Sequence, residues 1–392
     1  MTRLKVLHLI TTLPRLSGAA DNTRYTVNLL DPGRYEVHLA AGSSPFDASR
    51  VARHVRTEML PHLGRPLSPV RDALATRELR RLLRRERYDI VHTHNSKAGI
   101  LGRVAARLAG VPVVVHTAHT ISWVASGVAP VNGAYLWAER ACAPLCDKII
   151  TVSEANRARY MAARVGRPEQ YVTVYSGVET QAYLSGAERE GFRREVSAGP
   201  QTRVVVWLGR LNRQKDPLTY VRACRLLADR LPDVRFLLVG EDSVGESLDP
   251  EVRRLVDDLH LTSTFTLLGY RADVPRILAG ADLVMHSSLY EGLGRSIVEA
   301  MLAGVPLAAT AVDGVCEAVV SGERGGLLVA PGDPAALADA ATRLMAEPDL
   351  AARVTAAGRR WALERFDVGT MVTTIDELYQ QLWHQVTRGS RA

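Results

Sequence analysis

The 392-residue sequence contains no long uninterrupted apolar run, although 47% of its residues are hydrophobic. A membrane-spanning helix would need roughly 18 such residues in succession. The first ten residues, MTRLKVLHLI, also lack the apolar segment and the small-residue cleavage site of a signal peptide. Because 23% of the residues are charged, the composition excludes membrane-spanning, collagenous and disordered classes and is typical of a globular protein. We therefore expect a cytoplasmic protein.

Cysteine is scarce, with four residues at positions 142, 146, 224 and 316. Only Cys142 and Cys146 are close in sequence, and their spacing places them on one face of a predicted helix. We interpret them as buried free thiols in a reducing cytosol, with a metal or redox site as the alternative.

Lysine is equally scarce, with four residues against 45 arginines, and the net charge of +7 is unevenly distributed. Residues 1–185 carry a net charge of +11, whereas residues 186–392 carry a net charge of −4. The imbalance disfavours a nucleic-acid partner for the whole chain and leaves an anionic partner open for the first half.

Two successive series of short apolar strands alternate with helices. The strands are predicted at 4–10, 89–94, 111–116 and 147–154, and then at 202–210, 234–241, 265–270, 281–288 and 305–310. Nearly continuous β-branched runs separated by helices indicate parallel strands that are covered on both faces. We therefore predict an α/β protein of two Rossmann-like, doubly wound domains facing a cleft.

The predicted domain boundaries follow from a break in this rhythm. The chain becomes polar and glycine-containing over 176–201. This places an N-terminal domain at 1–185, a C-terminal domain at 186–368, and a final helical segment at 369–392. The sequence leaves open whether that helix packs back on the first domain.

The first candidate site follows the strand at 202–210. The loop GRLNRQKD (209–216) places Arg210 and Lys215 just before the next predicted helix. A forked guanidinium and a flexible ammonium on one loop suit a diphosphate. The alternative is a solvated pair of surface side chains.

The second candidate lies in SSLYEGLGRSIVEAM (287–301). Glu291, Gly292, Leu293 and Gly294 precede a helix that we expect to begin near Arg295 or Ser296, with Glu299 one turn later. Glycines before a helix N-terminus let backbone N–H groups approach an anion, although a turn with a helix cap would look similar. Eight residues of helix span about 12 Å, which fits the paired carboxyl groups of a glycosidase poorly. Glu291 and Glu299 are better suited to hold hydroxyls at two places along an extended ligand.

A third set of residues follows two other strands of the second half. Gly240 lies at the end of the strand at 234–241, Tyr270 ends the strand at 265–270, and Arg271 follows it. They could border a nucleobase, and structural turns explain them equally well.

Together these residues resemble the retaining nucleotide-sugar glycosyltransferases of family 4, which have the GT-B fold. The family signature Glu-x7-Glu is matched by Glu291 and Glu299, and its phosphate-binding basic pair is matched by Arg210 and Lys215. The segment DIVHTHNSKAGILGRVAARLAGVPVVVHTAH is most similar to the branch that contains bacterial polysaccharide transferases. The resemblance covers nearly the whole chain.

The resemblance implies a role for each of these residues. Arg210 and Lys215 would neutralise the leaving diphosphate, Glu299 would bind the ribose, and Glu291 would contact the donor sugar. The backbone from Gly292 to Ser296 would cradle phosphate and sugar. The sequence contains no Asp-x-Asp motif, so we expect no metal and no cofactor beyond the nucleotide-sugar donor.

The first half would supply the acceptor side. Four histidines stand at two predicted strand ends, in HTHN (92–95) and HTAH (116–119). We do not expect a zinc site, because no cysteine, aspartate or glutamate lies nearby in sequence. The resemblance instead implies that His119 contacts a sugar hydroxyl or orients the attacking group.

Two further residues complete the predicted acceptor side. Asn95 ends HTHN, and Trp123 either stacks on an acceptor or packs in the protein. Gly18 is instead a predicted donor-binding residue: it retains the second glycine of a loop that reads Gly-Gly in many relatives, where Ser17 replaces the first, and that glycine lets the backbone approach the phosphate or the acceptor. Thr120 also replaces the glycine that follows the histidine in many relatives.

The first half also contains a basic run at 71–88, RDALATRELRRLLRRERY. We expect a helix that turns Leu74, Leu79, Leu82 and Leu83 toward a core and arginines to solvent. It is either a solvated surface helix or a peripheral contact with anionic lipid on the inner membrane face.

We therefore predict a retaining, metal-independent transferase that moves a hexosyl or N-acetylhexosaminyl group, most plausibly from a UDP-linked donor, to a hydroxyl in polysaccharide or glycolipid assembly. The alternatives are a transferase acting on a small-molecule natural product and a non-catalytic nucleotide-sugar-binding protein. The sequence does not specify the sugar, the acceptor, the linkage or the oligomeric state.

Overall fold

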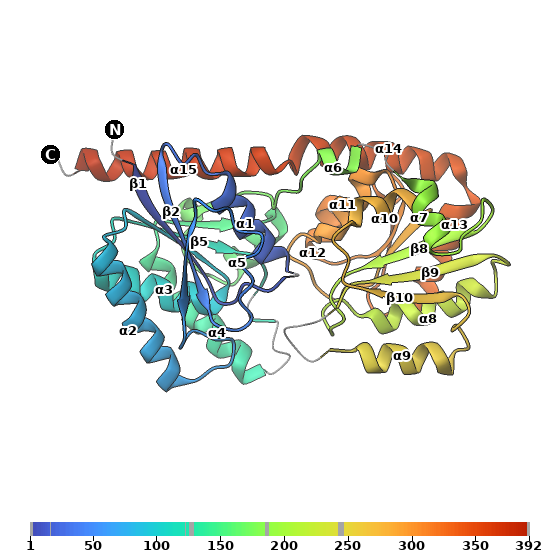
Figure 1. Ribbon diagram of the computed structural model, residues 1–392, viewed down its shortest axis with the longest axis horizontal. Coiled ribbons are helices and arrows are strands. Elements are labelled where there is room, and N and C mark those ends of the chain that lie inside the picture. Colours follow the sequence, from blue (N-terminus) through green and yellow to red (C-terminus); the bar gives the residue numbers. More distant parts are fainter. Residues whose placement is uncertain are drawn as a thin grey trace. The chain divides into compact units, whose positions relative to one another are not determined.

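The computed structural model describes residues 3–15, 17–121, 123–124, 129–184, 188–241 and 247–389 (Figure 1). The chain forms two compact units. The N-terminal unit comprises residues 1–177 and 368–392, and the C-terminal unit comprises residues 178–367. Within the described residues, no helix is long and apolar enough to cross a membrane.

The N-terminal unit contains a seven-stranded sheet in the order β3-β2-β1-β4-β5-β6-β7, and every neighbouring pair is parallel. Its strands are β1 (Leu4–Ile10), β2 (Tyr35–Gly42), β3 (Arg56–Leu60), β4 (Ile90–His94), β5 (Val113–Ala118), β6 (Lys148–Thr151) and β7 (Tyr171–Thr173). Its helices are α1 (Gly18–Leu29), α2 (Pro69–Glu86), α3 (Ser96–Ala109), α4 (Ala129–Cys142), α5 (Glu154–Ala162) and α15 (Val368–Gly389), with short 3₁₀ turns at Ala143–Leu145 and Pro168–Gln170.

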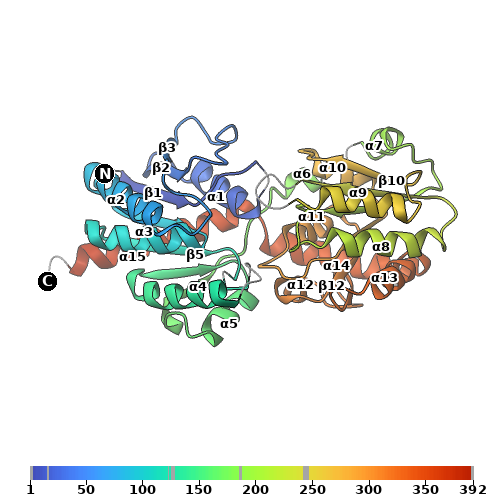
Figure 2. The ribbon, with the colours of Figure 1, turned by 90° about the horizontal axis from the view of Figure 1, so that it is seen from below.

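Helices cover both faces of this sheet, and each face has its own core (Figures 1 and 2). Alternate residues of β1 divide between the two cores: Leu7 and Leu9 pack with α2 and α3, whereas Val6 and Ile10 pack with α1 and α15. The period of two along a strand produces this division. The last helix, α15, is therefore an integral part of the N-terminal unit, although it lies at the end of the sequence.

The C-terminal unit contains a six-stranded parallel sheet in the order β10-β9-β8-β11-β12-β13. Its strands are β8 (Arg203–Leu208), β9 (Val234–Val239), β10 (Phe265–Gly269), β11 (Leu283–His286), β12 (Leu307–Thr310) and β13 (Gly326–Val329). Its helices are α6 (Gln181–Leu184), α7 (Arg189–Glu195), α8 (Pro217–Ala228), α9 (Asp249–Asp258), α10 (Val274–Gly280), α11 (Arg295–Ala303), α12 (Asp313–Ala318), α13 (Pro334–Ala346) and α14 (Pro348–Arg365).

Both sheets reverse their strand order at one point, between β1 and β4 in the N-terminal unit and between β8 and β11 in the C-terminal unit. In doubly wound sheets, ligands bind outside the carboxyl ends of the strands at such a switch point. The loops that follow these strands are therefore where each unit is expected to bind its ligand.

The α/β class and two Rossmann-like sheets are confirmed, and every predicted strand is present. The sequence did not reveal β2, β3, β7 or β13. The N-terminal unit passes into the C-terminal unit after residue 177, whereas the sequence predicted this boundary after residue 185.

Two local expectations of the N-terminal unit were wrong. Cys142 ends α4 and Cys146 follows a 3₁₀ turn, so the two do not share one helix, although both are buried free thiols. Leu74 is 39% exposed, and Ala75 takes its place in the core beside Leu79, Leu82 and Leu83.

Candidate active site

The loops after β8 and β11 meet at the switch point of the C-terminal unit. The loop after β8 leads into α8, whose N-cap Asp216 accepts a hydrogen bond from the backbone N–H of Thr219 at 3.2 Å. The backbone N–H of Leu289 donates to the Gln214 carbonyl at 2.8 Å, and the Gln214 amide donates to the Tyr290 carbonyl at 3.1 Å. These bonds hold the two loops together.

Side chains extend this connection. The buried Trp207 indole donates to Ser287 Oγ at 2.9 Å, and Ser287 Oγ donates to the carbonyl oxygens of Lys215 at 3.0 Å and Asp216 at 2.7 Å. Arg210 donates to the Gln214 side chain at 3.1 Å. The predicted cations Arg210 and Lys215 therefore lie on one loop whose backbone is anchored to the neighbouring strand end.

Lys215 and Glu291 form an ion pair at this junction. The Glu291 side chain is only 7% exposed, and its Oε1 also accepts a hydrogen bond from Ser288 Oγ at 2.8 Å and lies 3.4 Å from His286 Nε2. Burial alone would raise the pKa of Glu291, but the Lys215 charge and the hydrogen bonds from His286 and Lys215 outweigh it. The pKa of Glu291 is therefore well below its usual value, and the carboxylate is ionised at neutral pH.

The helix α11 begins at Arg295, as predicted. Its N-cap Gly294 has φ of +80°, a left-handed conformation that favours glycine. Within the described part of the chain, the buried Ser296 Oγ has no hydrogen-bond partner. Arg295 Nη2 lies 3.8 Å from Glu299 Oε1 one turn further on. Leu293 is buried in the loop before the helix. A hydroxyl and backbone N–H groups at a helix N-terminus are suited to an anion.

The third predicted set has structural contacts of its own. A Cβ at Gly240 would lie 1.8 Å from the Gly209 carbonyl oxygen, so the close approach of two backbones requires glycine there. Arg271 donates to both oxygens of Asp273 at 2.7 and 2.6 Å and to Glu195 at 2.6 Å. Tyr270 is partly buried beside it. These contacts give Gly240 and Arg271 a structural role.

In the N-terminal unit, the loops after β1 and β4 carry Gly18 and Asn95. Gly18 is exposed and begins α1, capped by Ser17. Asn95 caps α3 with φ of +63° and ψ of +164° but makes no side-chain cap bond. A non-glycine residue in this sparsely populated conformation is typical of functional sites.

Histidines gather on one face of the same sheet. His8 of β1 is paired in register with His92 of β4, and both point to the face covered by α1 and α15, as do His94 and Thr117. His119, two residues beyond Thr117, is partly exposed, and its Nε2 lies 3.1 Å from His94 Nδ1. His8 was not predicted from the sequence, although alternation along β1 places it on the same face of the sheet as the histidines of the HTH motif on β4.

The fourth histidine of the two motifs points the other way. His116 lies on the opposite face of the sheet, where its Nδ1 is 3.0 Å from Thr93 Oγ1. The HTAH motif is therefore divided: His119 contacts His94 of the HTHN motif, whereas His116 points to the opposite face of the sheet.

Three of these histidines could hold a metal ion. One ring nitrogen from each of His8, His92 and His94 lies within 4.8 Å of the others, and all three residues are buried. The ring nitrogens also have side-chain hydrogen-bond partners, which are considered below.

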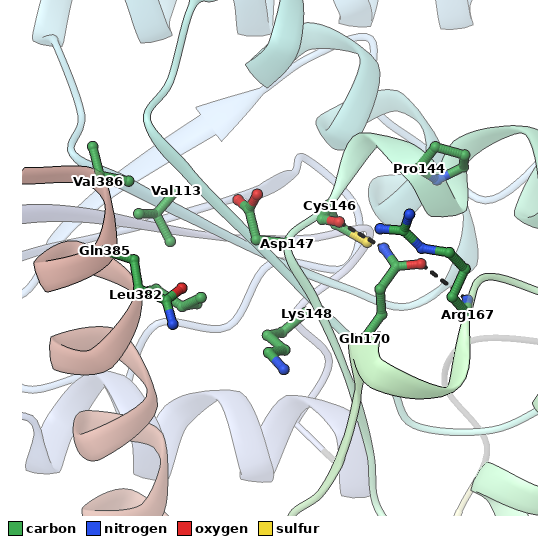
Figure 3. A pocket seen from close by; sticks show the side chains of 10 residues that line it. All are labelled: Val113, Pro144, Cys146, Asp147, Lys148, Arg167, Gln170, Leu382, Gln385 and Val386. Atoms are coloured by element: carbon green, nitrogen blue, oxygen red, sulfur yellow. Dashed lines mark hydrogen bonds between the residues drawn. The ribbon is translucent and has the colours of Figure 1, made fainter. Parts of the chain in front are cut away.

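Trp123 packs against Tyr160 with ring centroids 4.7 Å apart and joins the core on the α2 and α3 face. A hollow of about 280 Å³ lies elsewhere in this unit (Figure 3). There Leu382 and Gln385 of α15 lie opposite Asp147 and Lys148 near β6. No predicted site residue lines this hollow.

Two family models match the chain. One, described as Glycosyltransferase Family 4, matches residues 17–182, and the other, described as Glycosyl transferases group 1, matches residues 202–347. Over 331 residues the sequence is 30% identical to UDP-Gal:alpha-D-GlcNAc-diphosphoundecaprenol alpha-1,3-galactosyltransferase of Escherichia coli, covering 84% of each chain.

Two further proteins are similar over most of the chain. Identity is 30% with 2-deoxystreptamine glucosyltransferase of Streptomyces kanamyceticus, covering 76% of this chain and 78% of that one. The structure of Anabaena HepE in complex with UDP and glucose superposes with a TM-score of 0.82, over 97% of this chain and all of the other, at 23% identity. The last likeness concerns the fold alone.

Proposed function

The chain is a glycosyltransferase that belongs to family 4 and has the GT-B fold, and from that premise we propose that it transfers a hexosyl group from a UDP-linked sugar to a hydroxyl acceptor. The observation that carries the proposal is the junction of the loops after β8 and β11. There Lys215 pairs with Glu291 of the loop that leads to α11, and the Ser296 hydroxyl at the start of α11 has no hydrogen-bond partner among the described residues. A partly buried cation and a helix N-terminus on adjacent strand ends suit a diphosphate.

These contacts support the donor-binding roles that the family resemblance implies. Lys215 and Arg210 neutralise the diphosphate, the α11 N-terminus from Gly292 to Ser296 binds phosphate and sugar, and Glu299 binds the ribose. Glu291 Oε1 is occupied by Lys215 and Ser288, whereas no described residue bonds Oε2. Glu291 Oε2 is therefore the oxygen that accepts a hydrogen bond from a donor-sugar hydroxyl.

The reaction we propose retains the configuration at the anomeric carbon and uses no metal. The acceptor hydroxyl attacks from the face that the diphosphate leaves, and the departing phosphate oxygen accepts the hydroxyl proton. Negative charge develops on the leaving group, so the main catalytic contribution is the stabilisation of that charge by Lys215 and Arg210. In the N-terminal unit, His119 and Asn95 serve the acceptor side, where His119 contacts a sugar hydroxyl.

The acceptor we favour is lipid-linked, as in the name of the Escherichia coli relative. The helix α2 supports this choice, because exposed Val70 and Leu74 and exposed Arg77 and Arg81 follow one another at helical spacing on one face. Apolar side chains followed by arginines suit a surface of anionic lipid. We propose that the protein contacts the membrane peripherally through α2.

The test is transfer from a panel of UDP-hexoses and UDP-N-acetylhexosamines, with UDP release and product mass as readouts. A polyprenyl-diphosphate-linked N-acetylglucosamine and an aminocyclitol are the two acceptors to compare. We expect transfer to the lipid-linked acceptor, undiminished by EDTA, and an α-linkage from an α-linked donor by NMR. Transfer to the aminocyclitol alone would favour the small-molecule alternative, which the Streptomyces kanamyceticus relative supports. UDP-sugar binding without turnover on any acceptor would contradict an enzymatic role.

A further inference from the structure

Six side chains of the N-terminal unit form one continuous line of hydrogen-bonding groups on the sheet face covered by α15. In order, they are Thr117, His92, Tyr379, His8, His94 and His119. The line begins in the core and ends at the partly exposed His119.

The inner half of the line joins β4, β5 and α15. His92 Nε2 lies 2.6 Å from Thr117 Oγ1, and His92 Nδ1 lies 2.5 Å from the Tyr379 hydroxyl. The same hydroxyl lies 3.3 Å from His8 Nε2. The outer half runs from His8 Nδ1 to His94 Nε2 at 3.0 Å, and from His94 Nδ1 to His119 Nε2 at 3.1 Å. Only His119 Nδ1 has no partner among the described residues.

The four rings are neutral near pH 7. Burial lowers the pKa of His8 and of His119 to about 3, and burial holds the pKa values of His92 and His94 well below the ordinary histidine value. A neutral imidazole carries one N–H donor and one acceptor nitrogen. Each ring in the line must therefore donate at one nitrogen and accept at the other.

This requirement leaves only two arrangements of protons. Every step joins the Nδ1 side of one group to the Nε2 side of the next, with the Tyr379 hydroxyl donating to one neighbour and accepting from the other. If one ring carries its proton on Nδ1, the next must as well. All four histidines are therefore either Nδ1–H or Nε2–H, and one ring cannot change alone without leaving a buried donor facing a donor.

Thr117 decides between the two arrangements. Thr117 is only 2% exposed. Its hydroxyl has one hydrogen-bond partner among the described residues, His92 Nε2. If His92 donated from Nε2, the Thr117 proton would be buried without an acceptor, which is costly. Thr117 therefore donates to His92, and the whole line takes the Nδ1–H form.

We propose that this line locks His119 in the Nδ1–H tautomer, so that His119 presents a hydrogen-bond donor to its ligand. His8, His92, His94 and Tyr379 are positioning residues that act through His119. The proposal rests on the proposed function, in which His119 contacts a sugar hydroxyl. With Nδ1 protonated and Nε2 accepting from His94, His119 donates to a hydroxyl oxygen and does not serve as a base.

A metal ion bound by His8, His92 and His94 is the competing use of the same nitrogens. The hydrogen-bond line accounts better for the geometry, because both nitrogens of each of these rings already face a partner at 2.5–3.3 Å. Metal binding would also consume a nitrogen that the line needs to reach His119.

The decisive measurement is the tautomer of each ring in the full-length protein. With ¹⁵N-labelled histidine, long-range ¹H–¹⁵N spectra distinguish Nδ1–H from Nε2–H, and single histidine substitutions assign the signals. We expect the Nδ1–H pattern for His8, His92, His94 and His119 between pH 6 and 8. An Nε2–H pattern at any of the four would overturn the proposal, as would stoichiometric metal in the purified protein that shifts these signals.

The variant Tyr379→Phe tests the coupling without removing a ring. We expect the His119 signals to move toward a mixture of tautomers and kcat/KM to fall by about twofold to tenfold, the range for one hydrogen bond. The matched control is Tyr35→Phe, whose hydroxyl bonds Asp376 and Gln380 of α15 outside the line, and it should leave the histidine signals unchanged.

An unchanged His119 tautomer in Tyr379→Phe would contradict the proposal. The spectra need no substrate, so they separate it from the proposed function. A uniform Nδ1–H line in a protein without transferase activity would uphold the tautomer lock and overturn the transferase assignment.

Discussion

The two units place polar side chains at equivalent strand ends of similar sheets, but they accommodate these groups in opposite ways. After β8 and β11, the C-terminal unit buries a carboxylate, Glu291, and compensates it with the Lys215 cation. On β1 and β4 and just after β5, the N-terminal unit aligns uncharged imidazoles that compensate one another by hydrogen bonds. A charged site suits a charged part of a ligand such as a diphosphate, whereas a neutral hydrogen-bond donor suits sugar hydroxyls. The electrostatics of the two sites therefore support the proposed division into a donor side and an acceptor side.

The bulk charge of each half does not reveal this division. The N-terminal half carries the net positive charge, yet its strand-end site is neutral, and the cations of the proposed diphosphate site lie in the half with net negative charge. The excess arginine of the N-terminal half lies on exposed surfaces such as α2 instead. Local placement, and not net charge, determines which ligand portion each unit suits.

The largest effect is expected from Lys215→Ala. Removing a cation that stabilises a leaving diphosphate should lower kcat by about 100-fold to 1000-fold in a UDP-release assay. It also leaves Glu291 buried without its partner, which typically costs about 3–5 kcal/mol of stability.

The double variant Lys215→Ala/Glu291→Gln separates the two effects, because it should restore stability in denaturant unfolding but not activity. The matched control is Lys148→Ala in the N-terminal unit, whose ammonium donates to the Glu169 carbonyl. Near-normal turnover of Lys215→Ala would contradict the donor-site assignment.

Acid should destabilise the two sites over different pH windows. The folded pKa values of His8, His92, His94 and His119 are lowered, so the unfolded state binds more protons and stability falls as the pH drops below about 6.5. Each such ring costs up to about 1.4 kcal/mol per pH unit.

The pKa of Glu291 is also lowered, so its contribution is lost only as the pH falls below the unfolded value of about 4.3. Burial also lowers the pKa of His286, which lies near Glu291. His286 therefore adds one histidine titration to this site. Hydrogen exchange at pH 7 and pH 5, corrected for intrinsic rates, should therefore show greater loss of protection in β1, β4 and β5 than in β8 and β11. Equal losses in the two sheets would refute this contrast, and exchange between pH 7 and 9 serves as the control.

Substitution of single ligand-binding groups should distinguish the ligands that the two units bind. Glu299→Ala removes a charged hydrogen bond to the proposed ribose and should weaken UDP binding in calorimetry by about tenfold to 150-fold. Asn95→Ala in the N-terminal unit should leave UDP affinity unchanged and raise KM for the acceptor. Glu251→Ala on the exposed face of α9 controls for the loss of a carboxylate. Unchanged UDP affinity of Glu299→Ala would remove its ribose role.

The two sites also differ in how far the sequence reveals them. Lys215 and Glu291 were both proposed from strand-end loops, and α11 begins where the glycines indicated, because donor-site chemistry lies in contiguous motifs. Their direct ion pair was not predicted, since it depends on the adjacency of β8 and β11, which are separated by two further strands in sequence. His94 and His119 were recognised, but His8 and Tyr379 were not. They come from the first strand and the last helix, and only the sheet order and the docking of α15 bring them together.

The last effect is expected at the surface of α2. Each basic residue near an anionic membrane contributes about 1 kcal/mol, so Arg77→Gln/Arg81→Gln should weaken binding to phosphatidylglycerol vesicles by roughly 30-fold at low salt. The matched control is Arg253→Gln/Arg254→Gln on α9 of the C-terminal unit, where both residues are exposed. Substituting Val70 and Leu74 by serine should reduce the binding that persists at high salt, because apolar insertion is not screened by ions. Equal losses of vesicle binding from the α2 and α9 variants would mean that the net charge of the whole chain determines its attraction to anionic lipid. The basic excess of the N-terminal unit would then not orient the protein on the membrane.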